Sequence, residues 1–227
     1  MLRGEFQLPI HYDLAAVTLM AATGALAGLR KRYDLVGILS LALVSALGGG
    51  LLRDGLFLQG GPPAMLGDGR YLVAVIAGGA VATWFGRHLR RLRLPILVLD
   101  ALALGIYAVV GAQKALDAGL PALSASFVGV VNAVGGGLLR DLLSREEPLM
   151  FQPGTFYALA AVVGEAVYLP LVVTLRLEPA QAALWSIAAT FATRLLSVAL
   201  GWRTLAVPDA ERRDPDGPPG RPPGAAT

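Results

Sequence analysis

Residues 48–54 read Gly-Gly-Gly-Leu-Leu-Arg-Asp, and residues 135–141 repeat these seven amino acids without a change. The shift of 87 positions that superposes the two copies also aligns residues elsewhere in the chain. The aligned pairs include Asp13 with Asp100, Gly24 with Gly111, and Ser45 with Asn132. Because a long internal period indicates a structural unit that occurs more than once, the chain is predicted to contain two copies of one unit.

The composition places these units in a lipid bilayer. Of the 227 residues, 55% are hydrophobic and 15% are charged, and the mean hydropathy is +0.61. This leaves too little polar surface to coat a soluble globule. Most of the uncharged runs approach the ~20 residues that span a hydrocarbon core. The runs cover residues 14–29, 35–52, 71–86, 101–113, 118–139, 148–164 and 179–193. They lack the polar faces of soluble helices and the alternation of barrel strands, so we predict an all-α integral membrane protein with seven transmembrane helices.

Each copy of the unit holds three of these helices. The first unit is predicted over residues 8–94 and the second over 95–178, followed by a seventh helix over 179–205. A unit with an odd number of helices ends on the opposite side of the membrane, so the second unit is inverted relative to the first. Residues 206–227 are rich in proline and have no apolar face, which predicts a disordered cytoplasmic tail.

The distribution of basic residues predicts the orientation. Ten lysines and arginines fall on one side of the membrane and five on the other. The ten are Arg30, Lys31, Arg32, Arg87, Arg90, Arg91, Arg93, Arg140, Arg145 and Arg203. The five are Arg3, Arg53, Arg70, Lys114 and Arg176. Since cytoplasmic loops carry the excess of positive charge, we expect the N-terminus outside and the C-terminus in the cytoplasm, with the chain in the inner (plasma) membrane.

The two glycine triplets allow two interpretations. They are Gly48, Gly49 and Gly50 in the second helix, and Gly135, Gly136 and Gly137 in the fifth. Small residues let helix backbones approach closely, so the triplets can serve packing alone. Alternatively, they break the helix and turn backbone carbonyls towards a water-filled path. Two copies in inverted units, each before an arginine and an aspartate, favour the break.

Each triplet is followed by an Arg-Asp pair, Arg53-Asp54 and Arg140-Asp141. Adjacent residues on a helix do not face each other, so each charge is expected to pair elsewhere. Snorkelling towards the lipid headgroups is the alternative. Because charges inside membrane proteins usually face a pathway or one another, we hypothesise that the arginines form a gate or bind an anionic group such as a lipid phosphate. The aspartates would then anchor the arginines or meet the ion.

Four further residues at matched positions are candidates for lining a path. Asp13 and Asp100 lie at or near the starts of the first and fourth helices, where capping of free backbone N–H groups is the alternative role. Ser45 and Asn132 precede the triplets by three residues and could offer an oxygen to a passing cation. Serine in a membrane helix also bonds its own backbone, so both roles stay open.

Other residues point away from catalysis. Glu165 and Arg194 are opposite charges inside the sixth and seventh helices, and we predict a buried structural pair between them. The chain contains no cysteine and no credible pair of nucleophile and base, so no enzyme activity is expected. We expect no metal site, and no cofactor beyond a bound lipid.

The paired motifs and their matched upstream aspartates resemble the prokaryotic branch of the trimeric intracellular cation channels, over about residues 8–205. The repeat domain of that family also bears the name glycine-transporter domain. The resemblance implies a homotrimer with a separate pore in each subunit, lined by helices bent at the glycine triplets and conducting potassium and other monovalent cations. The basic Lys-Glu-Val motif of the animal members is missing from the second repeat, so phosphoinositide regulation is not implied.

Two functions remain open from the sequence. The first is a passive cation channel, and the second is a secondary transporter of a small zwitterion such as glycine, which inverted repeats and broken helices fit equally well. The expected partners are potassium or other monovalent cations, membrane lipid and further copies of the chain. Nucleic acid is not expected, because the basic residues sit at helix ends rather than along one face.

Overall fold

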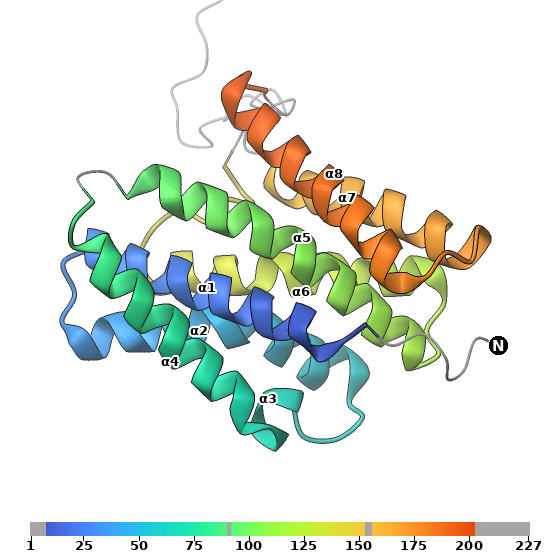
Figure 1. Cartoon of the computed structure of the whole chain (residues 1–227), viewed down its shortest axis with the longest axis horizontal. Helices are drawn as coiled ribbons and strands as arrows, with labels where there is room; N and C mark the ends of the chain where they lie inside the picture. Colours follow the sequence, from blue (N-terminus) through green and yellow to red (C-terminus); the bar gives the residue numbers. More distant parts are fainter. Residues whose placement is uncertain (1–7, 90–91, 153–155, 203–227) are drawn as a thin grey trace, which may run out of the picture.

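The structure is a computed structural model that describes residues 8–89, 92–152 and 156–202 (Figure 1). All the regular structure in this described part is helical. The elements are α1 (Ile10–Arg30), α2 (Leu35–Leu52), η1 (Arg53–Leu58), α3 (Ala64–Gly67), α4 (Gly69–Gly86), α5 (Arg93–Asp117), α6 (Ala122–Leu143), α7 (Tyr157–Leu169), η2 (Pro170–Thr174) and α8 (Pro179–Ala199). The two η elements are π-helices that continue α2 and α7. The predicted tail at 206–227 lies outside the described residues.

Seven helices are long and apolar enough to cross a membrane, as predicted. α2 with η1 makes one of these spans, and α7 with η2 makes another. Local signals set several boundaries. Asp34 caps α2 by accepting a hydrogen bond from the Gly37 backbone N–H at 2.8 Å. Pro179 occupies the first position of α8, where a missing N–H removes no helical hydrogen bond.

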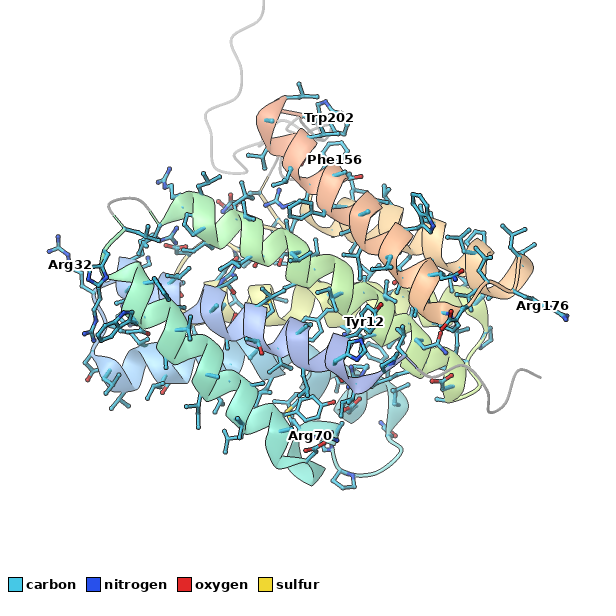
Figure 2. The ribbon with its side chains drawn as sticks, viewed as in Figure 1. Tyr12, Arg32, Arg70, Phe156, Arg176 and Trp202 are labelled. Atoms are coloured by element: carbon cyan, nitrogen blue, oxygen red, sulfur yellow. The ribbon has the colours of Figure 1, made fainter. Side chains whose placement is uncertain are left out.

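The outer surface of the bundle is apolar. Large hydrophobic side chains are exposed along α2, α4, α6, α7 and α8, among them Val36, Val73, Trp84, Leu123 and Trp185, whereas α1 and α5 are mostly buried. Figure 2 shows side chains projecting from the outside of the helices, with Arg32 and Arg176 at opposite ends of the bundle. A soluble monomer does not expose so much contiguous apolar surface, so this face is the one that contacts lipid or another membrane-embedded surface.

The two three-helix units are inverted. The first unit consists of α1, α2 and α4, and the second of α5, α6 and α7. Figure 1 shows that α1 and α5 run in opposite directions, and that α4 and α7 do so as well. α1 packs on α5 and α2 packs on α6, so the units meet along two pairs of equivalent helices. The fold is therefore two inverted three-helix repeats with α8 as a seventh spanning helix.

The glycine triplets form the contact between α2 and α6. A Cβ atom on Gly49 would collide with the backbone carbonyl of Asn132, and one on Gly136 would collide with the carbonyl of Ser45. Since Ser45 and Gly49 align with Asn132 and Gly136 under the 87-residue shift, these are two copies of one contact. Small residues are used in the same way inside each unit, because Gly24 on α1 lies against α2 and Gly111 on α5 lies against α6.

The predicted helix break at the triplets is wrong. Both triplets are buried inside uninterrupted α-helix, and irregular helix starts only at Arg53, where η1 begins. The glycines let two helix backbones touch, which is the packing interpretation of the sequence. Close approach brings many backbone atoms into contact and offsets the low helix propensity of glycine.

The seventh helix breaks the symmetry of the two units. Gly78 of α4 lies against Thr18 of α1, whereas the corresponding Gly164 of α7 lies against Thr190 of α8. Gly105 of α5 also faces Thr190. In the first unit, α1 and α4 pack directly on each other. In the second unit, the corresponding helices α5 and α7 both pack on α8.

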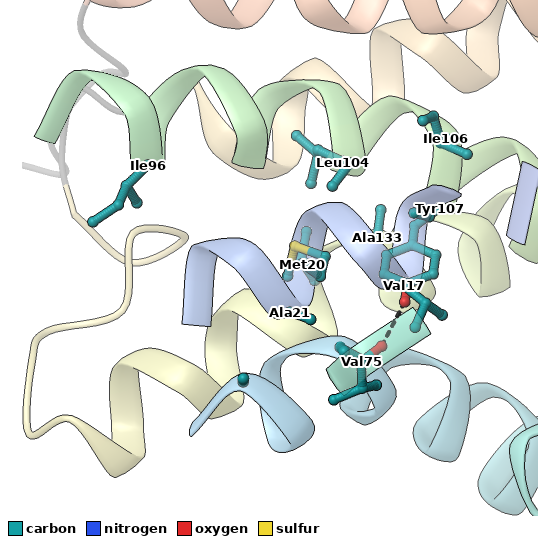
Figure 3. Close-up of a cluster of buried hydrophobic side chains, with 14 of the residues drawn as sticks. Val17, Met20, Ala21, Val75, Ile96, Leu104, Ile106, Tyr107 and Ala133 are labelled. Atoms are coloured by element: carbon teal, nitrogen blue, oxygen red, sulfur yellow. Dashed lines mark hydrogen bonds between the residues drawn. The ribbon is translucent and has the colours of Figure 1, made fainter. Parts of the chain in front are cut away.

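The apolar core lies where α1, α5 and α6 meet. Figure 3 shows Met20 and Val17 of α1, Leu104 and Tyr107 of α5, and Ala133 of α6 together in this cluster. The Tyr107 hydroxyl donates a hydrogen bond to the Ala46 backbone carbonyl of α2, so it is satisfied within the core. This bond and the small alanines around it hold the two units together at mid-depth.

We expect Gly49→Ala and Gly136→Ala each to lower the free energy of unfolding. Alanine favours a helix by about 1 kcal/mol relative to glycine, but the added methyl has to push two backbones apart, and overpacking costs about 1–3 kcal/mol. Thermal unfolding of the purified protein in detergent measures the change. Gly55→Ala and Gly69→Ala are matched controls, because a Cβ at either site meets nothing within 4 Å. Equal unfolding temperatures for all four variants would contradict the proposed contact.

Candidate functional site

Two clusters of charged residues lie inside the bundle at equivalent places in the two units. The Asp13 cluster consists of Asp13, Arg53, Asp54 and Tyr71. The Arg53 guanidinium donates to both oxygens of Asp54, at 2.6 and 2.9 Å. The Tyr71 hydroxyl donates to the Asp13 carboxylate at 2.7 Å, and the Lys114 ammonium donates to the same oxygen at 2.6 Å. α1, η1 and α4 of the first unit and α5 of the second unit therefore meet at this cluster.

The Asp100 cluster consists of Asp100, Arg140, Asp141 and Tyr157. Arg140 lies between two carboxylates, with Nη1 donating to Asp100 at 2.6 Å and Nε donating to Asp141 at 3.0 Å. Nη1 also donates to the Thr23 hydroxyl of α1 at 3.2 Å. Because Arg140 is 2% exposed and Asp100 is 2% exposed, their charges interact with little screening by water.

The expectation that each charge of the Arg-Asp pairs finds its partner elsewhere holds for Arg140, which pairs with Asp100, but neighbouring residues also pair with each other. Arg53 contacts Asp54 and Arg140 contacts Asp141, because the long arginine side chain folds back over the next residue. Each aspartate also accepts a backbone N–H from the loop that follows, from Ala64 at 3.1 Å and from Leu149 at 3.2 Å. The pairs therefore fix the ends of α2 and α6 to their loops.

Both arginines are buried within the protein, at 2% exposure each. A side chain that snorkels to the headgroups would need to reach the membrane surface. Neither guanidinium reaches the outer surface of the bundle, which argues against headgroup snorkelling. The gate and the binding of an anionic group such as a lipid phosphate stay predictions for these two residues.

Asp13 and Asp100 do not cap their helices. The N-cap residues of α1 and α5 are Pro9 and Leu92, and neither makes a side-chain capping bond. Asp13 lies in the first turn of α1, while Asp100 lies two turns inside α5. Their carboxylates are instead used in the two clusters.

Ser45 and Asn132 lie at the crossing of α2 and α6, between the clusters. Asn132 donates through Nδ2 to the Tyr107 backbone carbonyl at 2.7 Å, and its Oδ1 accepts from Arg53 at 3.4 Å. The Ser45 hydroxyl lies 3.5 Å from the Thr23 hydroxyl. Asn132 thus connects the Asp13 cluster to the crossing. That the two side chains meet a passing cation stays a prediction.

The two tyrosines were missed in the sequence, as was the role of Lys114. Tyr71 and Tyr157 begin the third helix of each unit, but they are related by a shift of 86 residues rather than 87. A single fixed shift therefore hides their equivalence, and a local realignment at Gly78 and Gly164 recovers it.

The predicted pair between Glu165 and Arg194 is wrong. Among the described residues, neither Glu165 oxygen has a hydrogen-bond partner, and Arg194 Nε and Nη1 have none either. Glu165 points to Gly129 of α6, whereas Arg194 lies over the ring of Tyr157, with 5.2 Å from its Cζ to the ring centroid. Arg194 therefore belongs beside the Asp100 cluster.

The two clusters differ in their access to the outside. A cavity of about 340 Å³ opens at the Asp13 cluster. Its polar lining residues are Asp13, Tyr71, Gln113, Lys114 and Asp117. All four members of the Asp100 cluster are at most 5% exposed. Asp13, Arg53 and Tyr71 are as buried as the Asp100 cluster, at 5%, 2% and 5% exposure, so the difference between the clusters is the cavity beside Asp13. We call the end with this cavity the open end, and the end at the Asp100 cluster the closed end.

An ion-pair bridge joins the two units at the closed end. Arg30 and Lys31, at the end of α1, both contact Glu146 in the loop after α6, and the Lys31 contact is 2.9 Å long. Burial alone would raise the pKa of the Glu146 carboxyl, but the hydrogen bond from Lys31 and the charge of Arg30 outweigh it and hold the pKa below its usual value. At the open end the aligned residues are Asp117 and Gln59, which cannot form the same ion pair.

Within the described ranges, no group of three or more histidine, aspartate and glutamate side chains is placed to hold a metal ion. The carboxylates of the two clusters instead form ion pairs with Arg53, Lys114 and Arg140.

Comparisons with known proteins agree with this architecture. A family model described as "Glycine transporter" matches residues 10–87 and 97–172, one match in each repeat. A UPF0126 membrane protein of Deinococcus radiodurans is 42% identical over 157 residues, which cover 68% of this chain and 73% of the relative. The UPF0126 inner membrane protein YadS of Escherichia coli K12 is 32% identical, over 82% of this chain and 89% of YadS.

Solved structures give the same assignment. The trimeric intracellular cation (TRIC) channel orthologue from Rhodobacter sphaeroides superposes with a TM-score of 0.79 and 31% identity, over 85% of this chain and 97% of that chain. A second TRIC structure, concerned with conductance, gives a TM-score of 0.76 and 31% identity over 88% of this chain and 98% of that one. The chain therefore belongs to the prokaryotic family of multi-pass membrane proteins that includes the TRIC channels and the UPF0126 proteins.

Proposed function

We propose that the protein is a cation channel that conducts potassium and other monovalent cations, with one pore in each subunit of a homotrimer. The observation that carries this proposal is the pair of charged clusters in inverted copies, one beside an open cavity and one closed. Arg140 lies between the carboxylates of Asp100 and Asp141. In the other cluster Arg53 pairs with Asp54, and Lys114 pairs with Asp13. The likeness to TRIC channel structures, at 31% identity, supports the same function.

In this proposal the path enters at the cavity beside Asp13 and passes the crossing of the glycine triplets to reach the Asp100 cluster. The triplets keep side chains out of the middle of the protein, so Ser45 and Asn132 supply the polar groups there. Asp13 and Asp117 line the entrance together with Lys114, and these carboxylates are the first that an entering cation would meet. Bound lipid covers the apolar outer surface.

Arg140 acts as the gate in this proposal. It occupies the two carboxylates that a passing cation would otherwise meet, and it fills the closed end of the path. Opening requires Arg140 to leave at least one of them. Arg53 pairs with Asp54 in the same way, but its cluster includes Asp13, which lines the cavity, so we place Arg53 at the open end of the path.

A carrier for a small zwitterion such as glycine is the second candidate. The description of the family model favours it, and a site open to one side only is also what alternating access requires. The two functions differ in flux. A channel gives unitary currents that follow the potassium gradient, while a carrier gives saturable uptake without them.

We propose that the closed end faces the cytoplasm of the inner membrane, with the N-terminus of the chain outside. Arg53 and Arg140 are buried inside the bundle and do not lie in the loops. Leaving them out lowers the number of basic residues by one on each side of the membrane. The excess remains at the end that carries Arg30, Lys31 and Arg32, so the positive-inside rule gives the same orientation.

Planar-bilayer recording in asymmetric potassium chloride tests the channel. We expect unitary currents that reverse towards the potassium potential. Silence from well-folded protein, together with saturable glycine uptake into liposomes, would replace the channel by the carrier.

We expect Arg140→Gln to raise the current at a given voltage several-fold, because Asp100 and Asp141 lose the cation that occupies them. Arg145→Gln is the matched control, since Arg145 is exposed at the same end of the bundle. Unpairing two buried carboxylates also destabilises a fold, so size-exclusion chromatography accompanies the recording, and Arg140→Lys retains the charge without the bidentate geometry. Wild-type currents from folded Arg140→Gln would rule out the gate.

Single-cysteine variants test the orientation, since the chain has no cysteine of its own. In spheroplasts, a membrane-impermeant maleimide should label Arg176→Cys, and it should label Arg32→Cys only after the membrane is permeabilised. Both side chains are exposed and lie at opposite ends of the bundle (Figure 2). The reverse labelling pattern would invert the assignment.

A further inference from the structure

We propose that Arg194 of α8 is the counter-charge of the Asp100 cluster, in the role that Lys114 has at the Asp13 cluster, and that it sets the ion selectivity of the closed end. This inference rests on the proposed channel function and assigns part of it to the seventh helix. It is based on the charges of the two clusters: residues of the two repeats balance the first cluster, but leave one negative charge unbalanced in the second.

The charges of the first cluster balance. Asp13 and Asp54 carry two negative charges, and Arg53 carries one positive charge. Lys114 supplies the second positive charge, through the 2.6 Å ion pair with Asp13. Lys114 comes from α5, so the second unit completes the cluster of the first unit.

The second cluster cannot be completed in the same way. Asp100 and Asp141 surround Arg140, which again leaves one negative charge in excess. Under the 87-residue shift, the residue of α1 that corresponds to Lys114 is Ala27. A buried alanine carries no charge, so the first unit gives the second cluster no cation.

Arg194 fills this place from outside the repeat. It is 2% exposed, and its guanidinium lies over the Tyr157 ring at 5.2 Å from the centroid. Asp100 and Arg140 both act on it electrostatically. α8 can bring Arg194 there because it packs on α5 and α7, where the two repeats differ in structure. A cation held against an aromatic face stays charged and in position without a direct ion pair.

The cluster also retains unused polar atoms. Asp100 Oδ2, Tyr157 Oη, and Arg194 Nε and Nη1 are buried, and among the described residues none has a hydrogen-bond partner. Buried polar groups normally form hydrogen bonds, and a buried group without a partner is unfavourable. An acceptor, a hydroxyl and two donors in one buried cluster are suited to bind a water molecule or a passing ion. Arg194 therefore influences that occupant by its charge and is not locked into a structural pair.

Removing the charge of Arg194 leaves the second cluster with one net negative charge. A cation then binds more favourably there and an anion less so, because a unit charge at this range acts through a medium of low dielectric constant. Removing the charge of Asp100 has the opposite effect, and removing both restores the balance.

The test compares Arg194→Met, Asp100→Asn and the double variant in asymmetric potassium chloride. We expect Arg194→Met to raise the permeability ratio of potassium to chloride about three-fold or more, Asp100→Asn to lower it, and the double variant to return close to wild type. Arg194→Lys keeps the charge and should retain the wild-type ratio. Arg145→Met is the matched control, because it removes an exposed positive charge at the same end of the bundle.

The outcomes separate this inference from the channel itself. Absence of current from wild-type protein refutes the channel. If wild-type protein conducts but folded Arg194→Met has the wild-type permeability ratio of potassium to chloride, the role of the Arg194 charge is refuted. The same holds if Arg194→Lys changes this ratio as much as Arg194→Met does. A double-mutant cycle measured by thermal unfolding tests the charge coupling without any current. Arg194→Met and Asp100→Asn together should destabilise the protein less than the sum of their separate effects. Strict additivity would overturn the coupling.

Discussion

The contact between two glycine triplets is the constraint on which the rest of the protein depends. Gly49 and Gly136 place the backbones of α2 and α6 so close together that neither site accommodates a methyl group. The same contact occurs twice, related by the inverted repeat, so the crossing lies on the local axis between the units. A crossing of this kind holds two membrane helices together without a hydrophobic driving force, because it maximises van der Waals contact.

The position of the charged clusters follows from this crossing. Arg53 lies three residues beyond one triplet and Arg140 three residues beyond the other, and the two helices run in opposite directions. The clusters therefore lie on opposite sides of the crossing. Burial makes each arginine depend on its carboxylates, since an unpaired charge in this environment is strongly unfavourable. The structure therefore holds two buried charged sites, one on each side of the glycine crossing.

The duplication is imperfect, and the exceptions are informative. Lys114 has Ala27 as its counterpart, the bridge from Arg30 and Lys31 to Glu146 has no equivalent at the other end, and α8 packs into the second unit alone. These differences give the two ends unequal properties, with a cavity at Asp13 and a closed cluster at Asp100. A symmetric pair of repeats would have no reason to differ in this way. The asymmetry therefore comes from residues and a helix added to the repeat.

The sequence by itself determined the membrane class, the seven spans, the two inverted repeats and the importance of the Arg-Asp motifs, because apolar runs and an exact internal repeat are linear properties of the chain. Only the tertiary structure decided how those residues are used. It placed Tyr71 with Asp13, separated Glu165 from Arg194, turned each arginine back onto its neighbouring aspartate, and showed the triplets packed rather than broken. The physical reason is that side-chain length, helix crossing and burial decide which charges meet, and these quantities depend on neighbours far away in the sequence.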